Sequence, residues 1–215
     1  MYRPTTSLGA KILGLQSPQQ ALASPWVGGQ QPTVLGAAPA SVQRPFRGPE
    51  DTLRAMADAA LGPRGEKSFA VRQFTEHMLR DVWPKDYLGE ILAIRNTFVQ
   101  MSPWRPGVPL FKYTNDPRHV ELVKDPERMV DEIRQYGTTL VDCDEISAMA
   151  ATMCLQVGRE VELVALGFSK GELSHVGIRA REPKTGQWIW LDGVAGPKER
   201  EAAGRAVEIL TWSLD

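Results

Sequence analysis

The chain has 215 residues, of which 42% are hydrophobic and 24% charged, enough apolar material for one sizeable core. Its formal net charge is −1 at pH 7, so no overall field attracts nucleic acid or a membrane, and we expect neither as a partner. The sequence lacks the run of about 18 apolar residues that a transmembrane helix needs. It also lacks the apolar stretch of a secretory signal, so we expect a protein that no signal peptide exports.

Residues 1–48 differ in composition from the rest of the chain. They are rich in Pro, Gly and Gln and carry no acidic residue. Such a segment buries too little apolar surface to offset the entropy lost on ordering it. We therefore predict an extended or disordered arm over 1–48, followed by one domain over 49–215. Trp26 and Phe46 favour a second interpretation, in which the arm becomes ordered on a partner.

The first half of the predicted domain is helical. Apolar residues recur at helical spacing, and Gly or Pro ends each segment, which predicts helices over 50–61, 68–82, 87–101 and 126–136. Pro126 occupies the favoured first position of the last of these helices. The Pro- and Gly-rich residues 102–118 are expected to form a loop.

The second half changes from helical to alternating periodicity. Asp142 is the predicted N-cap of a helix that reaches Val157 and ends at Gly158. Alternation then predicts strands over 161–168, 175–181, 188–192 and 207–212, with a turn at 184–187 and a loop or short helix over 193–204. The predicted class is α+β, with the helices N-terminal to a small antiparallel sheet.

Two cysteines, Cys143 and Cys154, fall on the helix that Asp142 opens. Their separation of 11 positions corresponds to about 16 Å of helical rise, too far for a disulfide. We therefore expect the protein either to reside in a reducing compartment or to be insensitive to the redox state of its surroundings. We interpret Cys154, which has no charged neighbours, as a thiol of the core.

Cys143 is placed where a thiol can be activated. The N-terminus of a helix and a nearby imidazolium both lower a thiol pKa, and the sequence offers both. However, Asp142, Asp144 and Glu145 surround the thiol and would raise its pKa by charge repulsion. Activation would then depend on a histidine within hydrogen-bond reach of the sulfur.

His175 and Asp192 complete the candidate site. His175 starts one predicted strand and Asp192 ends its hairpin partner, so the carboxylate could orient the imidazole. Backbone N–H groups at the helix start could stabilise an oxyanion. The sequence leaves a side-chain donor open among four candidates: Trp104, Tyr113, Gln135 and Tyr136. We interpret His77 and His119 as structural.

Metal and nucleotide chemistry are not favoured. No pair of cysteines or histidines has the spacing of a zinc site, and the Gly-rich segments lack the Lys-Ser/Thr of a phosphate loop. We therefore predict no metal and no cofactor.

Asp142-Cys143-Asp144-Glu145 resembles the Gly-Asp-Cys-Asp-Asp motif of transglutaminase-like cysteine proteins of the papain-like superfamily. The His-Val start of the strand at His175 and the Trp-x-x-Leu-Asp ending at Asp192 are also similar. The lead-in that starts at Tyr113-Thr114-Asn115 resembles that of members encoded among tailed-phage structural genes. The resemblance covers about residues 68–195 and implies a papain-like fold with a Cys143–His175–Asp192 catalytic triad. Val141 and Gly193 depart from it, standing where the family usually has Gly and often has Pro.

Two functional hypotheses follow. The first is a thiol hydrolase or acyl transferase that acts on an amide of a peptide or protein through an acyl-enzyme on Cys143. The alternative is a phage virion or assembly protein that keeps the fold for interaction and binds virion subunits through residues 1–48. The corresponding locations are the cytoplasm and the virion.

Overall fold

The computed structural model describes residues 43–44, 48–115, 121–170, 173–193 and 205–214. Most of the predicted arm, His119 and the predicted loop over 194–204 lie outside the described residues.

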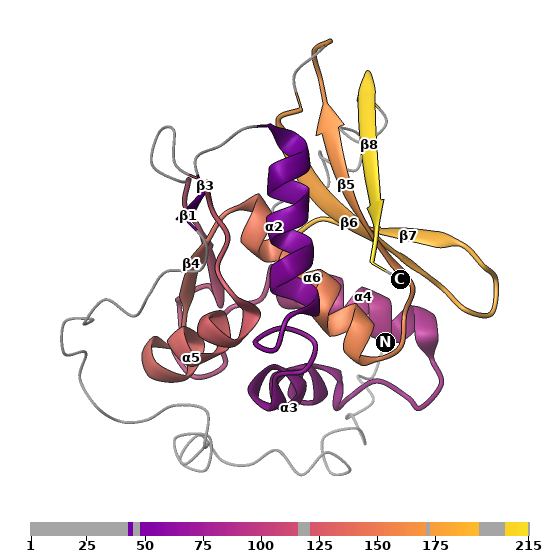
Figure 1. The fold of residues 1–215 in the computed structure, drawn as a ribbon. Coiled ribbons are helices and arrows are strands. Elements are labelled where there is room, and N and C mark those ends of the chain that lie inside the picture. Colours follow the sequence, from indigo (N-terminus) through magenta and orange to yellow (C-terminus); the bar gives the residue numbers. More distant parts are fainter. Residues whose placement is uncertain (1–42, 45–47, 116–120, 171–172, 194–204, 215) are drawn as a thin grey trace, which may run out of the picture.

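Among the described residues, five helices come before the main sheet, in the order expected from the sequence (Figure 1): α2 (Pro49–Leu61), α3 (Phe69–Leu79), α4 (Tyr87–Thr97), α5 (Pro126–Tyr136) and α6 (Cys143–Gln156). The side chains of Ser68 and Asp86 accept N-terminal backbone N–H groups of α3 and α4. Gly137 ends α5 in the left-handed conformation that glycine adopts without strain.

Four antiparallel strands form the second part: β5 (Val161–Gly167), β6 (His175–Arg181), β7 (Trp188–Leu191) and β8 (Glu208–Ser213). Their order in the sheet is β7-β6-β5-β8, so β7 and β8 are the edges. In β6, Val176, Ile178 and Ala180 are buried, as the alternation predicted. The α+β class, with helices N-terminal to an antiparallel sheet, is confirmed.

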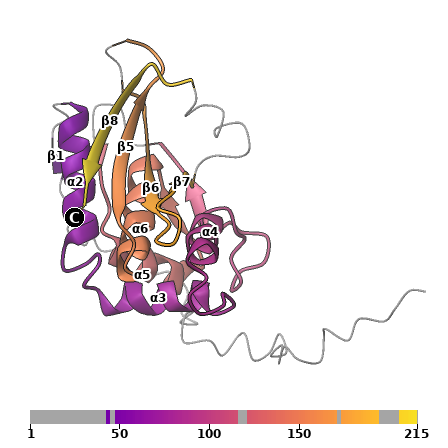
Figure 2. The same ribbon diagram turned by 90° about the vertical axis from the view of Figure 1, so that its right-hand side faces the viewer.

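Helix α6 is the centre of the domain. It contacts the other four helices as well as β5 and β6, and Figures 1 and 2 show it between the helical layer and the sheet. Most of its residues are buried, including both Met149 and Met153. A helix surrounded by other elements buries most of its faces, and the buried polar residues of α6 include Ser147 and Thr152. The position of the N-terminus of α6 is therefore fixed by the packing of the helix against these elements.

Two short strand pairs lie apart from the main sheet. β2 (Phe111–Tyr113) pairs in parallel with β4 (Thr139–Val141), and β1 (Gln43–Arg44) pairs antiparallel with β3 (Glu121–Leu122). The prediction of a loop over 102–118 is wrong at β2. Three residues carry no readable period, and the strand is fixed by a partner distant in sequence.

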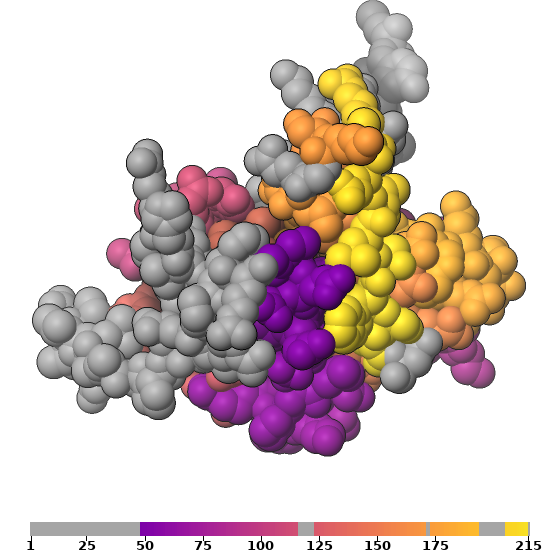
Figure 3. Space-filling model, turned by 45° about the horizontal axis from the view of Figure 1, so that its top comes forward, coloured from indigo at the N-terminus to yellow at the C-terminus, as the bar shows by residue number. Residues whose placement is uncertain are grey.

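The first helix and the last strand meet at the surface. Figure 3 shows α2 beside β8, where the Arg54 guanidinium carbon lies 5.9 Å from the centre of the Trp212 ring. Among the described residues, no helix combines the length and the apolar character needed to cross a bilayer.

Candidate active site

The strand β4 leads directly into α6, and Cys143 lies at the start of that helix. Asp142, which follows β4, accepts the backbone N–H groups of Asp144 and Glu145 at 3.0 and 3.4 Å through Oδ1. Glu145 Oε2 in turn accepts the backbone N–H of Asp142 at 2.8 Å, which completes a capping box. The predicted N-cap is confirmed, and Cys143 is the first residue of the helix.

His175 and Asp192 form a direct pair. His175 Nε2 and Asp192 Oδ2 are 2.6 Å apart, and their side chains are 16% and 4% exposed. His175 begins β6, and Asp192 follows the neighbouring strand β7, as the hairpin predicted. Asp192 therefore engages the Nε2 atom of the imidazole, and Nδ1 is the other ring nitrogen.

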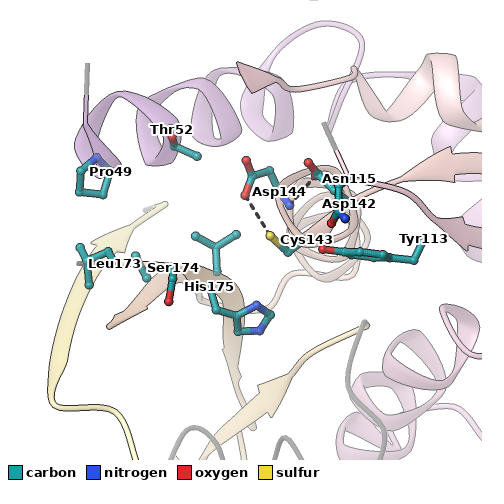
Figure 4. Close-up of a pocket in the computed structure, with 12 residues that line it drawn as sticks. Pro49, Thr52, Tyr113, Asn115, Asp142, Cys143, Asp144, Leu173, Ser174 and His175 are labelled. Carbon is teal, nitrogen blue, oxygen red and sulfur yellow. Dashed lines mark hydrogen bonds between the residues drawn. The ribbon is translucent and has the colours of Figure 1, made fainter. Parts of the chain in front are cut away.

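A pocket of about 280 Å³ brings the thiol and the imidazole together. Figure 4 shows Cys143 from α6 and His175 from β6 reaching into it. The other lining residues come from α2, from β2 and the residues after it, from the start of α6, and from β5, β6 and the residues before β6: Pro49, Thr52, Tyr113, Asn115, Asp142, Asp144, Ala165, Leu173, Ser174 and Val176. Two of the three proposed catalytic side chains thus share one cavity, and the third binds one of them.

The surroundings of Cys143 favour the protonated thiol. Burial is the main cause that raises its pKa far above the ordinary value, followed by the charges of Asp144 and Asp142. The Cys143 sulfur lies 3.5 Å from Asp144 Oδ1, to which the thiol donates. A hydrogen bond with the backbone of Val176 acts in the opposite direction and lowers the pKa.

Of the four side chains considered as oxyanion donors, Tyr113 lines the pocket. Trp104 instead stacks on His77, with ring centres 5.5 Å apart, and the Tyr136 carbonyl accepts from Arg105. Gln135 is exposed on α5. Asn115 lines the pocket and was missed as a candidate, although its place two residues after the candidate Tyr113 was a usable signal.

Both departures from the family pattern have a structural reason. Val141 is fully buried at the end of β4, paired with Tyr113, and does not line the pocket. Gly193 lies so close to Ile146 and Phe98 that an added Cβ would clash with both. A proline at that position would meet the same side chains.

The thiol and its two flanking acids are the group among the described residues that could hold a metal ion. One ligand atom from each of Asp142, Cys143 and Asp144 lies within 4.8 Å of the others. However, Oδ1 of Asp142 is already occupied by two backbone N–H groups of the helix cap. Both cysteines are free, and Cys154 is buried mid-helix.

The helices packed against an antiparallel sheet form an α+β fold that is similar to part of one solved structure. That structure is the "putative protease" of Parabacteroides distasonis, with a TM-score of 0.51 and 13% sequence identity. The match covers 76% of this chain and 29% of that protein, so this chain spans less than a third of its length. No family model and no curated protein matches the sequence.

Proposed function

We propose that this protein is a transglutaminase-like thiol hydrolase or acyl transferase, acting on a peptide or side-chain amide through Cys143, His175 and Asp192. The observation that carries the proposal is the 2.6 Å pair between His175 and the nearly buried Asp192, set in a pocket shared with Cys143. A short, shielded carboxylate–imidazole bond is what a catalytic base needs to keep one tautomer and one orientation. The likeness to a protease-like fold supports the same reaction class.

The reaction begins with the neutral thiol. His175 Nδ1 takes the proton from Cys143, and the sulfur forms a bond to the amide carbonyl carbon. Collapse of the tetrahedral intermediate breaks the carbon–nitrogen bond, and the imidazolium returns its proton to the departing amine. Water or a second amine then attacks the thioester, giving its proton to His175, and the sulfur leaves as the thiol.

Donors for the oxyanion come from two parts of the fold. The backbone N–H of Cys143 lies in the first turn of α6, where N–H groups point along the helix axis. Tyr113 and Asn115 add a hydroxyl and a carboxamide to the pocket wall. The substrate carbonyl is therefore expected between these side chains and the start of α6.

The test is the alkylation rate of Cys143 as a function of pH, compared in the native protein and in His175→Ala. We expect Cys143 to react faster than a free thiol below about pH 8, and the substitution to remove that advantage. A small activated ester should also acetylate Cys143, which peptide mass spectrometry would detect. A thiol no faster than a free cysteine, with or without His175, would contradict the enzymatic proposal.

One observation favours a second candidate, a phage virion or assembly protein that uses the fold without catalysis. Burial and two acids keep the pKa of Cys143 high, which suits an inert thiol as well as a slow nucleophile. In this proposal the arm binds neighbouring virion subunits. Removal of residues 1–42, which spares β1, should leave the domain folded but abolish co-sedimentation with assembled particles. Association that survives the deletion, while alkylation depends on His175, would leave the enzyme as the supported function.

A further inference from the structure

A lysine outside the pocket is joined to the start of the thiol helix. The ammonium of Lys124 lies 3.2 Å from Glu132 Oε2 on α5 and 3.9 Å from Glu145 Oε1 on α6. It also donates to the backbone carbonyl of Leu140 in β4. The three charged side chains are 17%, 15% and 5% exposed, so water screens their interactions only weakly.

The cluster is balanced in charge. Arg128 Nε lies 3.1 Å from Glu132 Oε1, and Glu132 Oε2 also accepts the hydroxyl of Thr139 at 2.6 Å. Two cations, Lys124 and Arg128, therefore face two carboxylates, Glu132 and Glu145. Glu132 is paired with both cations, and Lys124 is in addition paired with Glu145.

Glu145 links this cluster to the thiol. While Oε1 faces Lys124, Oε2 accepts the backbone N–H of Asp142, the N-cap that precedes Cys143. One carboxylate thus joins a lysine from the segment after β3 to the backbone of Asp142, the residue that precedes the proposed nucleophile. Oε2 is held by a hydrogen bond, and Oε1 interacts with the ammonium of Lys124 through charge alone at 3.9 Å.

We propose that Lys124 is a positioning residue of the thiol site, which neutralises Glu145 and fixes the start of α6 so that Cys143 can ionise during the reaction. The inference rests on the proposed function of Cys143 as a nucleophile. Lys124 touches no reacting atom, so its action passes through Glu145 and the backbone of Asp142.

Several ionisable groups face the thiol. The ionisable side chains around the pocket and behind it are Tyr113 from β2, Asp142 and Asp144 from the start of α6, His175 from β6 and Asp192 after β7. Asp144 and Asp142 are the charges that raise the pKa of Cys143. Glu145, the third acid of this stretch, is paired with Lys124 at 3.9 Å, and without the lysine its carboxylate would add a further negative charge close to the thiol.

The test is the pH dependence of Cys143 alkylation in four proteins: wild type, Lys124→Met, Lys124→Arg and the double variant Lys124→Met/Glu145→Gln. Lys124→Met should raise the midpoint of the alkylation rate against pH by about 0.5 to 1 pH unit. At a pH below the midpoint this corresponds to about three to ten times less thiolate. Lys124→Arg should stay near wild type. The double variant should return to it, because the carboxamide introduced at position 145 carries no charge and can still accept the Asp142 N–H.

A matched control is Lys67→Met. Lys67 is exposed and lies near the far end of α6, where the Gln156 carboxamide donates to the carbonyls of Glu66 and Ser68. Lys67→Met should leave the midpoint of Cys143 alkylation unchanged. Circular dichroism melting identifies any variant that fails to fold, and reaction below its melting range keeps the comparison valid.

The outcomes separate the two proposals. If wild type shows no His175-dependent reactivity, the proposed function fails whatever Lys124 does. If wild type is reactive but Lys124→Met keeps its midpoint, or the double variant does not restore it, Lys124 has no role at the thiol.

Discussion

Gly193 is packed directly against Ile146, so that a Cβ added at residue 193 would lie 2.3 Å from Ile146 Cγ2. The same Cβ would come within 2.8 Å of Phe98 Cβ. Because Gly193 follows Asp192, the absence of a side chain lets the carboxylate reach His175 from behind. The family preference for proline here would be incompatible with this packing.

Gly193→Ala should therefore displace Asp192 and lower the rate of Cys143 acylation about tenfold or more. Positioning groups respond steeply to shifts of this kind. The proton of His175 Nε2 should lose its downfield resonance in the NMR spectrum as the 2.6 Å bond breaks. A variant that keeps both the resonance and the rate would show that the loop can absorb the methyl group.

Asp144→Asn should make Cys143 more reactive. The substitution removes the charge that is the larger of the two electrostatic causes raising the thiol pKa. A fall of about one unit in that pKa corresponds to about ten times more thiolate at neutral pH. The alkylation rate is compared between His175→Ala and the double variant His175→Ala/Asp144→Asn. Because both proteins lack the imidazole, the difference reports the effect of Asp144. A rate equal to that of the parent would contradict this account.

Asp142 has two roles that substitution can separate. Asp142→Ala should remove the helix cap and lower the free energy of unfolding by about 1 kcal/mol. Asp142→Asn keeps a capping oxygen, so urea denaturation should find it close to wild type. Both variants should lower the pKa of Cys143, because each removes the same charge. If Asn destabilises as much as Ala, the carboxylate charge matters to the cap itself.

Cys154 should make stability fall at alkaline pH. Burial raises its pKa from 9.0 to about 12 in the folded protein. The unfolded chain therefore loses this proton first, and stability is complete below about pH 9 and declines as the pH rises towards 12. Urea midpoints between these values should fall less steeply in Cys154→Ala than in wild type. Parallel slopes for the two proteins would assign the alkaline loss to other groups.

The sequence predicted best where the signal is local. The helix that carries Cys143 was placed to within about a residue, because Asp142 and Glu145 cap one end and Gly158 has a positive φ at the other. The pairing of His175 with Asp192 followed from the register of a hairpin. These features depend on residues close in the chain.

The sequence did not predict the contacts between residues that lie far apart in the chain. β2 and β4 are short strands whose partners lie far apart in the chain, and α2 places Thr52 in the pocket from well upstream of Cys143. The contact between Lys124 and Glu145 likewise depends on how β3, β4 and α6 meet. No periodicity records such contacts, since each side chain looks like an ordinary charged residue in its own segment.

The edge position of β7 sets how the site should respond to heat. Within the described part of the chain, this four-residue strand pairs only with β6, whereas Cys143 begins a helix at the centre of the core. Edge elements open at lower free energy than central ones. Asp192, attached to β7, would leave His175 while α6 is still intact. Heat inactivation should thus precede melting of the helices, and stabilisation of the hairpin alone should extend the working temperature of the protein.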